Sequence, residues 1–315
     1  MGWLITGGAG YIGSHIVKLL SEEKQEITVI DNFSTGRKNR LPLSVDLVDL
    51  DICDFIGLEN LFTAKSFSHV IHLAARKSVA ESFLKSEVYE KENYEATRNL
   101  IDLAVSNQVK NFVFSSTAAV YGNLESGVAF ENSATNPISP YGSTKLKADN
   151  YLSGQIGKGN ISGVSLRYFN VAGAVEPKLA DLKSENLIPR IIDLNKTGFK
   201  PQVFGNDYST PDGTCVRDYV HVQDIARAHL LCAKEGNEQR LPSVLNVGTG
   251  KGSSVLDVIN SISKNLGKIT EFELLPRRTG DPALLIANTE LIANRLDFAP
   301  EFDLDAITKS AIATS

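Results

Sequence analysis

Cysteine is scarce in this chain of 315 residues, and what there is forms no recognisable site. Cys53, Cys215 and Cys232 are odd in number and far apart, and no two of them make a Cys-x-x-Cys pair. This pattern predicts reduced thiols and excludes a disulfide framework, while a thiolate metal site or a cysteine nucleophile is disfavoured. The five histidines show no metal-ligand spacing either. We therefore predict no metal.

The sequence also lacks an excess of basic charge and any long apolar run. Its net charge is −5, and lysine and arginine do not cluster, which argues against nucleic acid or an anionic membrane as a partner. No apolar stretch approaches the ~20 residues of a membrane span. A first core strand expected at residue 3 leaves no room for a leader, so we expect a cytoplasmic protein.

Strands and helices alternate along residues 1–170. Short apolar runs predict strands at Trp3–Thr6, Ile27–Ile30, Ser44–Leu47, His69–Leu73, Asn111–Ser115 and Val164–Tyr168. Segments with helical periodicity separate them, among them Ile12–Leu20 and Tyr94–Val105. This alternation is typical of an α/β fold with a doubly wound, Rossmann-like parallel sheet.

A smaller α/β lobe is expected from residues 171–315, with an approximate and interleaved boundary. Pro, Gly, Asn and Asp become more frequent there, and the elements are shorter: helices at Asn186–Asn195, His221–Ala233 and Val255–Leu266, and a strand at Ser243–Val247. Residues 248–253 resemble a phosphate loop, but Lys251 is followed by glycine, so an ordinary turn is the better interpretation.

Clustered glycines follow the first strand directly. Gly7, Gly10 and Gly13 open a helix, so that bare backbone N–H groups and the helix N-terminus suit a pyrophosphate. Asp31 closes the next strand, where a carboxylate accepts hydrogen bonds from an adenosine ribose. The same carboxylate would repel a 2′-phosphate, so NAD is expected over NADP. Arg37 is interpreted as a solvated loop charge.

A tyrosine and a lysine four residues apart, Tyr141 and Lys145, lie on one face of a helix expected from about Pro140 to Leu152. An ammonium beside a phenol favours the phenolate, which can serve as a general base. Thr117 follows the strand Asn111–Ser115, at the sheet edge where nicotinamide and substrate should meet. These three residues are the candidate catalytic group.

The chain resembles the extended short-chain dehydrogenase/reductase family, most of all its members that act on nucleotide-sugars. The likeness covers nearly the whole chain, and the motifs that carry it are TGGAGYIGSH at residues 6–15, VIHLAA at 70–75, SPYG at 139–142, LRYFNVAGA at 166–174 and VRDYVHV at 216–222. The resemblance implies a Rossmann fold, NAD as cofactor, a UDP-sugar as substrate and a homodimer packed through the helices at 94–105 and 141–152.

Residue by residue, the resemblance implies two sets of contacts. The set for NAD is Tyr11, Ile12, Asp31, Asn32, Asp51, Ile52, Leu73, Ala74, Ala75, Arg76, Lys77, Asn93, Thr117, Tyr141, Lys145 and Phe169. The set for the nucleotide-sugar is Thr117, Tyr141, Asn170, Asn186, Leu187, Gln202, Val203, Phe204, Arg217, Arg278 and Asp281. Independently of the resemblance, guanidinium groups such as those of Arg217, Arg277 and Arg278 bind phosphates well.

The implied activity is interconversion of UDP-glucose and UDP-galactose: oxidation at C4 by NAD, rotation of the 4-keto sugar and return of the hydride. Tyr141 acts as the base, Thr117 bonds the same oxygen, and Lys145 lowers the phenol pKa. Action on UDP-N-acetylhexosamines or UDP-uronic acids is an alternative, because the residue bordering the sugar is Leu285 (or Leu284), where a bulky tyrosine excludes acetamido groups in relatives.

Two other functions compete with epimerisation. A nucleotide-sugar dehydratase needs an acidic pair directly after the threonine, but this chain has Ala118 and Ala119 there. An NAD-sensing protein without activity would be expected to lose the Tyr141–Lys145 pair, which this chain keeps.

Overall fold

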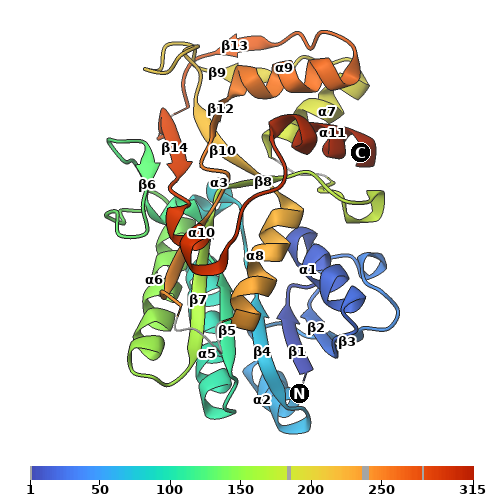
Figure 1. Ribbon diagram of the computed structural model, residues 1–315, viewed down its shortest axis with the longest axis vertical. Coiled ribbons are helices and arrows are strands. Elements are labelled where there is room, and N and C mark those ends of the chain that lie inside the picture. The colour runs from blue at the N-terminus through green and yellow to red at the C-terminus, as the bar shows by residue number, and fades with distance from the viewer. Residues whose placement is uncertain (1, 183–185, 236–240, 279) are drawn as a thin grey trace.

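Parallel strands build the larger of two lobes. The computed structural model describes residues 2–182, 186–235, 241–278 and 280–315. Within them, seven strands paired in parallel follow the order β11-β7-β5-β4-β1-β2-β3 (Figure 1). Their bounds are β1 Gly2–Thr6, β2 Ile27–Asp31, β3 Asp46–Asp49, β4 Phe67–His72, β5 Asn111–Ser115, β7 Ser162–Tyr168 and β11 Val244–Val247. The order reverses between β1 and β4, and ligands of such sheets bind at the carboxyl ends of the strands beside that point.

Helices cover both faces of this sheet, which confirms the predicted doubly wound fold. On one face α1 (Tyr11–Glu22) and α8 (Val222–Glu235) pack together and close an apolar core. On the other face lie α2 (Phe55–Ala64), α5 (Ala96–Ser106) and α6 (Pro140–Gly157). The central strands β1 and β5 and their neighbour β2 are buried at every residue, which is why they read as nearly continuous apolar runs.

The second lobe lies beyond the carboxyl ends of the large sheet (Figure 1). Its strands follow the order β12-β10-β14-β6, β8 pairs with β10, and β9 pairs with β13. The strand bounds are β6 Val128–Ala129, β8 Asn170–Ala172, β9 Gln202–Phe204, β10 Val216–His221, β12 Gly252–Ser254, β13 Glu273–Leu275 and β14 Leu284–Ala287. The remaining helices are α3 Val79–Leu84, α4 Ser86–Tyr89, α7 Leu187–Thr197, α9 Val255–Leu266, α10 Glu290–Leu296 and α11 Leu304–Thr314.

The two lobes exchange elements across residue 170. β11 comes after that position but pairs with β7 in the large sheet, and α8 packs on the same sheet. Conversely, β6 precedes residue 170 but pairs with β14 in the second lobe. The strand expected at Ser243–Val247 is therefore present as β11, but it belongs to the large sheet.

Several element bounds differ from the sequence-based expectation. β3 lies at Asp46–Asp49, two residues beyond the predicted strand, because its register against β2 pairs Thr28 with Asp46. The helix expected from His221 begins at Val222, since the residues before it form β10. A π-helical turn, Glu90–Glu95, precedes α5, and the expected start of that helix falls inside it.

Candidate active site

The glycine turn after β1 has the shape that phosphate binding requires. Gly7 has a φ of +68°, and a Cβ atom there would lie 2.8 Å from the backbone nitrogen of Ala74. A Cβ atom on Gly13 would lie 2.3 Å from the carbonyl oxygen of Gly7, so only glycine lets α1 begin this close to β1. Gly10 precedes α1 without a side-chain cap from the described residues, which leaves first-turn N–H groups for an anion.

Asp31 ends β2 beside this turn. Its buried carboxylate accepts hydrogen bonds from the backbone N–H of Ala9 at 3.0 Å and of Phe33 at 2.9 Å. Burial raises the pKa of Asp31, while these two bonds oppose that effect. A carboxylate has about four lone-pair sites, so acceptor capacity remains for ribose hydroxyls. Asp31 thus fits the ribose role and also braces the glycine turn.

A buried hydrogen-bonded chain fixes the loop after β4. His72 bonds the hydroxyl of Thr6 at 2.6 Å and that of Thr97 at 2.8 Å, and Thr97 donates to the carbonyl of Asn93. The side-chain amide of Asn93 then bonds both the N–H and the carbonyl of Arg76, at 2.8 and 2.9 Å. Asn93 therefore fixes the backbone of this loop with both amide atoms. His72, for which no role was predicted, supports Asn93 through Thr97.

The other predicted cofactor residues follow the carboxyl ends of neighbouring strands or begin α1, and so lie along one edge of the large sheet. Asn32 after β2 donates to Asp51 after β3 at 2.7 Å. The remaining members are Tyr11, Ile12, Ile52, Leu73, Ala74, Ala75, Lys77 and Phe169.

Thr117 and Tyr141 meet at the end of β5. Ser139 caps α6 by accepting from the N–H of Gly142 at 3.1 Å, and Pro140 opens the first turn. Gly142 lets this turn approach the segment after Thr117, because a Cβ atom there would lie 2.7 Å from the carbonyl oxygen of Ala119. In this arrangement Thr117 lies beside Tyr141 and lowers the pKa of its phenol.

Lys145 lies one turn further along α6 and is almost fully buried. Its Nζ donates to the carbonyl oxygen of Ser115 at 2.9 Å and stands 4.7 Å from the centroid of the Phe114 ring. Burial lowers the pKa of Lys145 to about 8, and the carboxylate of Asp149 opposes this.

The pKa of Tyr141 is set mainly by its burial. Burial raises it to about 12, and the neighbouring Thr117 offsets only part of this rise. Desolvation dominates this shift, and the ammonium of Lys145 is bonded to the carbonyl of Ser115, so the lowering of the phenol pKa by Lys145 stays a prediction.

A buried ion pair beneath Lys145 was missed. Asp149 accepts from Nε of Arg167 at 2.9 Å, and the two side chains are 1% and 5% exposed. Arg167 also donates to the hydroxyl of Tyr121 at 3.2 Å, which donates in turn to Asn246 at 2.6 Å. The available signal was an acid one further helical turn after Lys145.

Candidate nucleotide-sugar residues come together in the second lobe. Arg217 in β10 donates to Asp281 at 3.1 Å, and the guanidinium of Arg278 lies 3.8 Å from the centroid of the Phe204 ring. Arg277, by contrast, pairs with Asp207 at 2.6 Å, so of the two adjacent arginines Arg278 is the better phosphate candidate.

The rest of that set occupies three places. Asn170 starts β8, Asn186 precedes Leu187 at the start of α7, and Gln202 and Val203 belong to β9. Residue 279, inside the Arg278–Asp281 motif, lies outside the described residues.

Residues 248–251 form a turn around a buried acid, and residues 252–253 begin β12. Asp218 in β10 accepts from the N–H groups of Thr249 at 2.8 Å and Gly250 at 3.0 Å. The loop N–H groups thus serve a carboxylate of the protein, as the interpretation as an ordinary turn requires.

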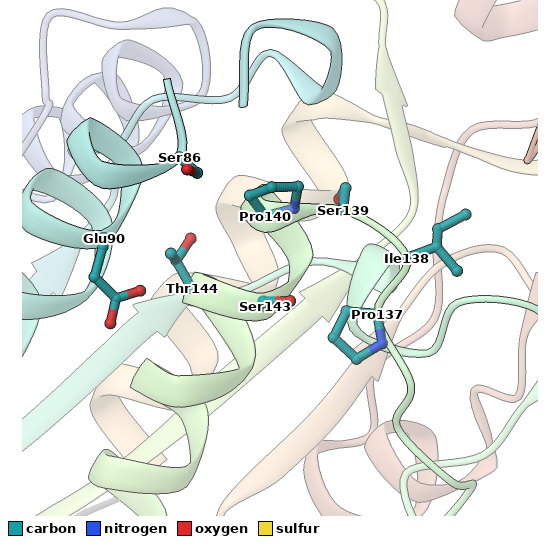
Figure 2. A pocket seen from close by; sticks show the side chains of 8 residues that line it. All are labelled: Ser86, Glu90, Pro137, Ile138, Ser139, Pro140, Ser143 and Thr144. Atoms are coloured by element: carbon teal, nitrogen blue, oxygen red, sulfur yellow. The ribbon is translucent and has the colours of Figure 1, made fainter. Parts of the chain in front are cut away.

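A cavity of about 380 Å³ lies beside the first turn of α6 (Figure 2). Hydroxyls of Ser86, Ser143 and Thr144 line it with Glu90, which pairs with Lys147 at 2.6 Å. Neither Tyr141 nor Lys145 reaches it.

The described residues contain no group of three His, Cys, Asp or Glu side chains able to hold a metal ion. The three cysteines are free thiols. In the same part of the chain, no helix has the length and apolarity needed to cross a membrane.

Comparison with known proteins agrees with this geometry. Residues 3–248 match the model of the NAD dependent epimerase/dehydratase family, and the chain belongs to that family. A UDP-glucose 4-epimerase of Corynebacterium glutamicum is 40% identical to it over 314 residues, which are 98% of this chain and 94% of the relative.

Solved structures are equally similar. A UDP-glucose-4-epimerase of Stenotrophomonas maltophila, with bound NAD and formylated UDP-arabinopyranose, superposes with a TM-score of 0.95 at 34% identity and covers 100% of this chain and 97% of that one. The UDP-Glc/GlcNAc 4-epimerase of Campylobacter jejuni gives 0.88 at 37%, covering 99% and 98%. The resemblance to the nucleotide-sugar enzymes is thus confirmed.

Proposed function

We propose that this protein interconverts UDP-glucose and UDP-galactose by inverting C4 of the sugar, with NAD as cofactor. The observation that carries the proposal is the placement of Tyr141 beside Thr117 at the carboxyl end of β5, with Lys145 one helical turn away. Removing a hydride from a sugar carbon also requires removing a proton from its hydroxyl, and this group can do so.

The residues of the crevice fit NAD. The N–H groups of the glycine turn suit its pyrophosphate, and Asp31 suits its adenosine ribose because free lone pairs remain on the carboxylate. When bound, NAD accepts the hydride from C4 and returns it to the opposite face of the 4-keto sugar.

The protein's own contribution is proton transfer and orientation. Tyr141 as phenolate takes the proton of the 4-hydroxyl and later gives it back, while Thr117 hydrogen-bonds the same oxygen. Lys145, whose pKa of about 8 leaves it largely protonated at neutral pH, supplies positive charge beside the site. Because the hydride returns to C4 and the proton to the same oxygen, the reaction has no net redox change.

The second lobe supplies groups for the nucleotide diphosphate. Arg217 and Arg278 present guanidinium groups that bind phosphate bidentately, and both are held in place by neighbours, Asp281 and Phe204. Asn170, Asn186, Leu187, Gln202 and Val203 complete the proposed site.

Leu285 is the better candidate for the residue that borders the sugar. It packs in a cluster with Ala118, next to Thr117, and with Phe169, whereas Leu284 points at Gly127. Leucine is smaller than tyrosine and cannot hydrogen-bond, so an acetamido group would meet less bulk at this side chain but would find no hydrogen-bond partner in it. We therefore place UDP-N-acetylhexosamines second, after UDP-glucose and UDP-galactose.

Two competing functions are less well supported. A dehydratase would need an acid and a base directly after Thr117. Ala118, which is buried, and Ala119 occupy those positions, and neither can transfer a proton. An NAD-sensing protein without activity would not require Thr117 and Tyr141 to lie side by side.

The assembly and location are further parts of the proposal. A homodimer through α5 and α6 is supported by half-buried Val105 and Tyr151 on those neighbouring helices and by half-buried Tyr94 in the π-helical turn before α5. The cytoplasm is supported by three separate free thiols. Light scattering of the purified protein tests the dimer.

Incubation with UDP-galactose tests the activity directly. Chromatography of the product should show a mixture with UDP-glucose and no net formation of NADH, and unchanged UDP-galactose would contradict the proposal. In parallel, kcat/KM for UDP-galactose should exceed that for UDP-N-acetylgalactosamine, and the reverse order would overturn our choice of main substrate.

A further inference from the structure

A segment of the second lobe crosses back to the glycine turn. Residues 173–181, which we call the clasp, run between β8 and α7 and pack beside α1 and the short helix Lys38–Arg40 (Figure 1). At one end of the clasp the hydroxyl of Tyr11 donates to the carbonyl of Gly173. At the other end Nη2 of Arg40 donates to the carbonyl oxygen of Ala180 at 2.6 Å.

Arg40 is an unusual residue for this position. It ends a short helix in the connection from β2 to β3, yet it is only 5% exposed. Charged arginines are rarely buried without a carboxylate partner, because losing water costs several kcal/mol. Within the described residues, the one side-chain hydrogen bond of Arg40 goes to a carbonyl, and its Nε has no partner among them.

The surroundings of Arg40 include two of the predicted cofactor residues. Its guanidinium interacts electrostatically with Arg37 and with Asp181 of the clasp, and then with Tyr11, which opens α1, and Asp31, which ends β2. Positive charge held at this point faces the region where the glycine turn offers N–H groups to a pyrophosphate.

The clasp also reaches the loop after β4. Asp181 lies 3.9 Å from Nζ of Lys77 and accepts from Asn186 at 2.9 Å. Arg40 and Lys77 follow strands on opposite sides of β1 in the sheet. Residues 180 and 181 of the clasp therefore lie across the carboxyl end of β1. Arg40 contacts them from one side and Lys77 from the other, and both cations belong to the larger lobe.

We propose that Arg40 is a cofactor-retaining residue, which fastens the clasp over the dinucleotide crevice and keeps NAD bound between turnovers. The inference rests on the proposed function, in which the hydride returns to the sugar and NAD has no need to leave. Arg40 acts here by positioning residues 173–181 and by its charge, not by chemistry at C4.

Dissociation of NAD from the purified holoprotein tests this role without reference to turnover. We would compare wild type, Arg40→Gln, Arg40→Lys and, as a control, Lys38→Gln, which removes the same charge from an exposed position two residues away. The readouts are NAD content per chain, the rate at which labelled NAD exchanges out, and the melting temperature. We expect NAD to leave Arg40→Gln roughly 10 to 100 times faster, with the rate for Arg40→Lys between those of Arg40→Gln and wild type.

Wild-type exchange rates in Arg40→Gln, or an equal acceleration in Lys38→Gln, would overturn the proposal. If Arg40→Gln does not fold, Arg40→Lys carries the test: faster exchange supports the role, and wild-type exchange refutes it. A wild-type protein that holds NAD but does not epimerise UDP-galactose would refute the proposed function alone, since the exchange rates are measured without sugar.

Discussion

Burial sets the protonation of individual side chains at the candidate site. Tyr141 needs added stabilisation to become a phenolate near neutral pH, because burial raises its pKa to about 12. Lys145 moves in the other direction, to a pKa of about 8. The two groups therefore act as a set, and removing the phenol oxygen should abolish proton transfer without disturbing the packing of the ring.

Tyr141→Phe should fold and bind NAD normally but lose about 10²- to 10⁴-fold in kcat, the usual contribution of a general base. Tyr151→Phe is the matched control, because Tyr151 lies on the same helix but bonds Asp102, away from the triad. Steady-state kinetics and NAD content decide the matter. Near-normal turnover of Tyr141→Phe would remove it from the role of base.

Asp31→Ala should weaken NAD retention by about tenfold or more and narrow the preference against NADP. The change removes acceptors for ribose, a charge that repels a 2′-phosphate and the brace on the N–H of Ala9. Asp49→Ala, at the exposed end of the neighbouring strand β3, is the control. Equilibrium binding of both dinucleotides provides the measurement, and unchanged affinities would refute this role of Asp31.

At the scale of elements, one face of α6 carries both the catalytic side chains and the ion pair that ties the helix to the sheet. Tyr141, Lys145 and Asp149 recur every fourth residue, and the ion pair of Asp149 with Arg167 ties the helix to β7. Gly142 brings the first turn of the same helix close to the segment after β5. The placement of the triad thus depends on how α6 docks against two strands.

Asp149→Ala should lower the free energy of unfolding by about 3–5 kcal/mol, because it leaves Arg167 buried without its carboxylate. Lys147→Ala breaks an exposed ion pair on the same helix and should cost less than about 1 kcal/mol. Urea unfolding of both variants measures the difference. A loss below about 1 kcal/mol for Asp149→Ala would show that this pair does not anchor α6.

Across the whole molecule the histidines are structural. Burial lowers the pKa of His15, His221 and His229 to about 4 and that of His72 to about 3. The folded chain therefore binds fewer protons at these sites than the unfolded chain between about pH 6.5 and pH 4. Lowering the pH through that range therefore favours unfolding. Above about pH 6.5 these histidines are neutral in both the folded and the unfolded chain, so none of this stability is lost.

The free energy of unfolding should fall between pH 7 and pH 5 by up to about 1.4 kcal/mol per pH unit for each buried histidine. Buried carboxylates such as Asp149, whose pKa burial raises, titrate with the opposite sign. The difference between wild type and His229→Gln isolates one histidine, and the variant should show a shallower slope. Urea unfolding at several pH values checks this, and equal slopes would refute it.

Local sequence determined much of the site. The glycine turn, Asp31 and the Tyr141–Lys145 pair each depend on residues within one turn or one strand-helix unit, where spacing fixes geometry. The alternation of strands and helices likewise determined the doubly wound sheet, because each buried strand has its own apolar run.

Only the tertiary structure decided what depends on distant segments. β11 joins a sheet whose other strands all precede residue 170. Arg40 is hydrogen-bonded to a carbonyl 140 residues away. Asp149 of α6 forms its ion pair with Arg167 of β7. The raised pKa of Tyr141 belongs here too, since desolvation is the sum of everything packed around the ring. Periodicity and spacing report on neighbours along the chain, whereas burial and ion pairing are set by neighbours in space.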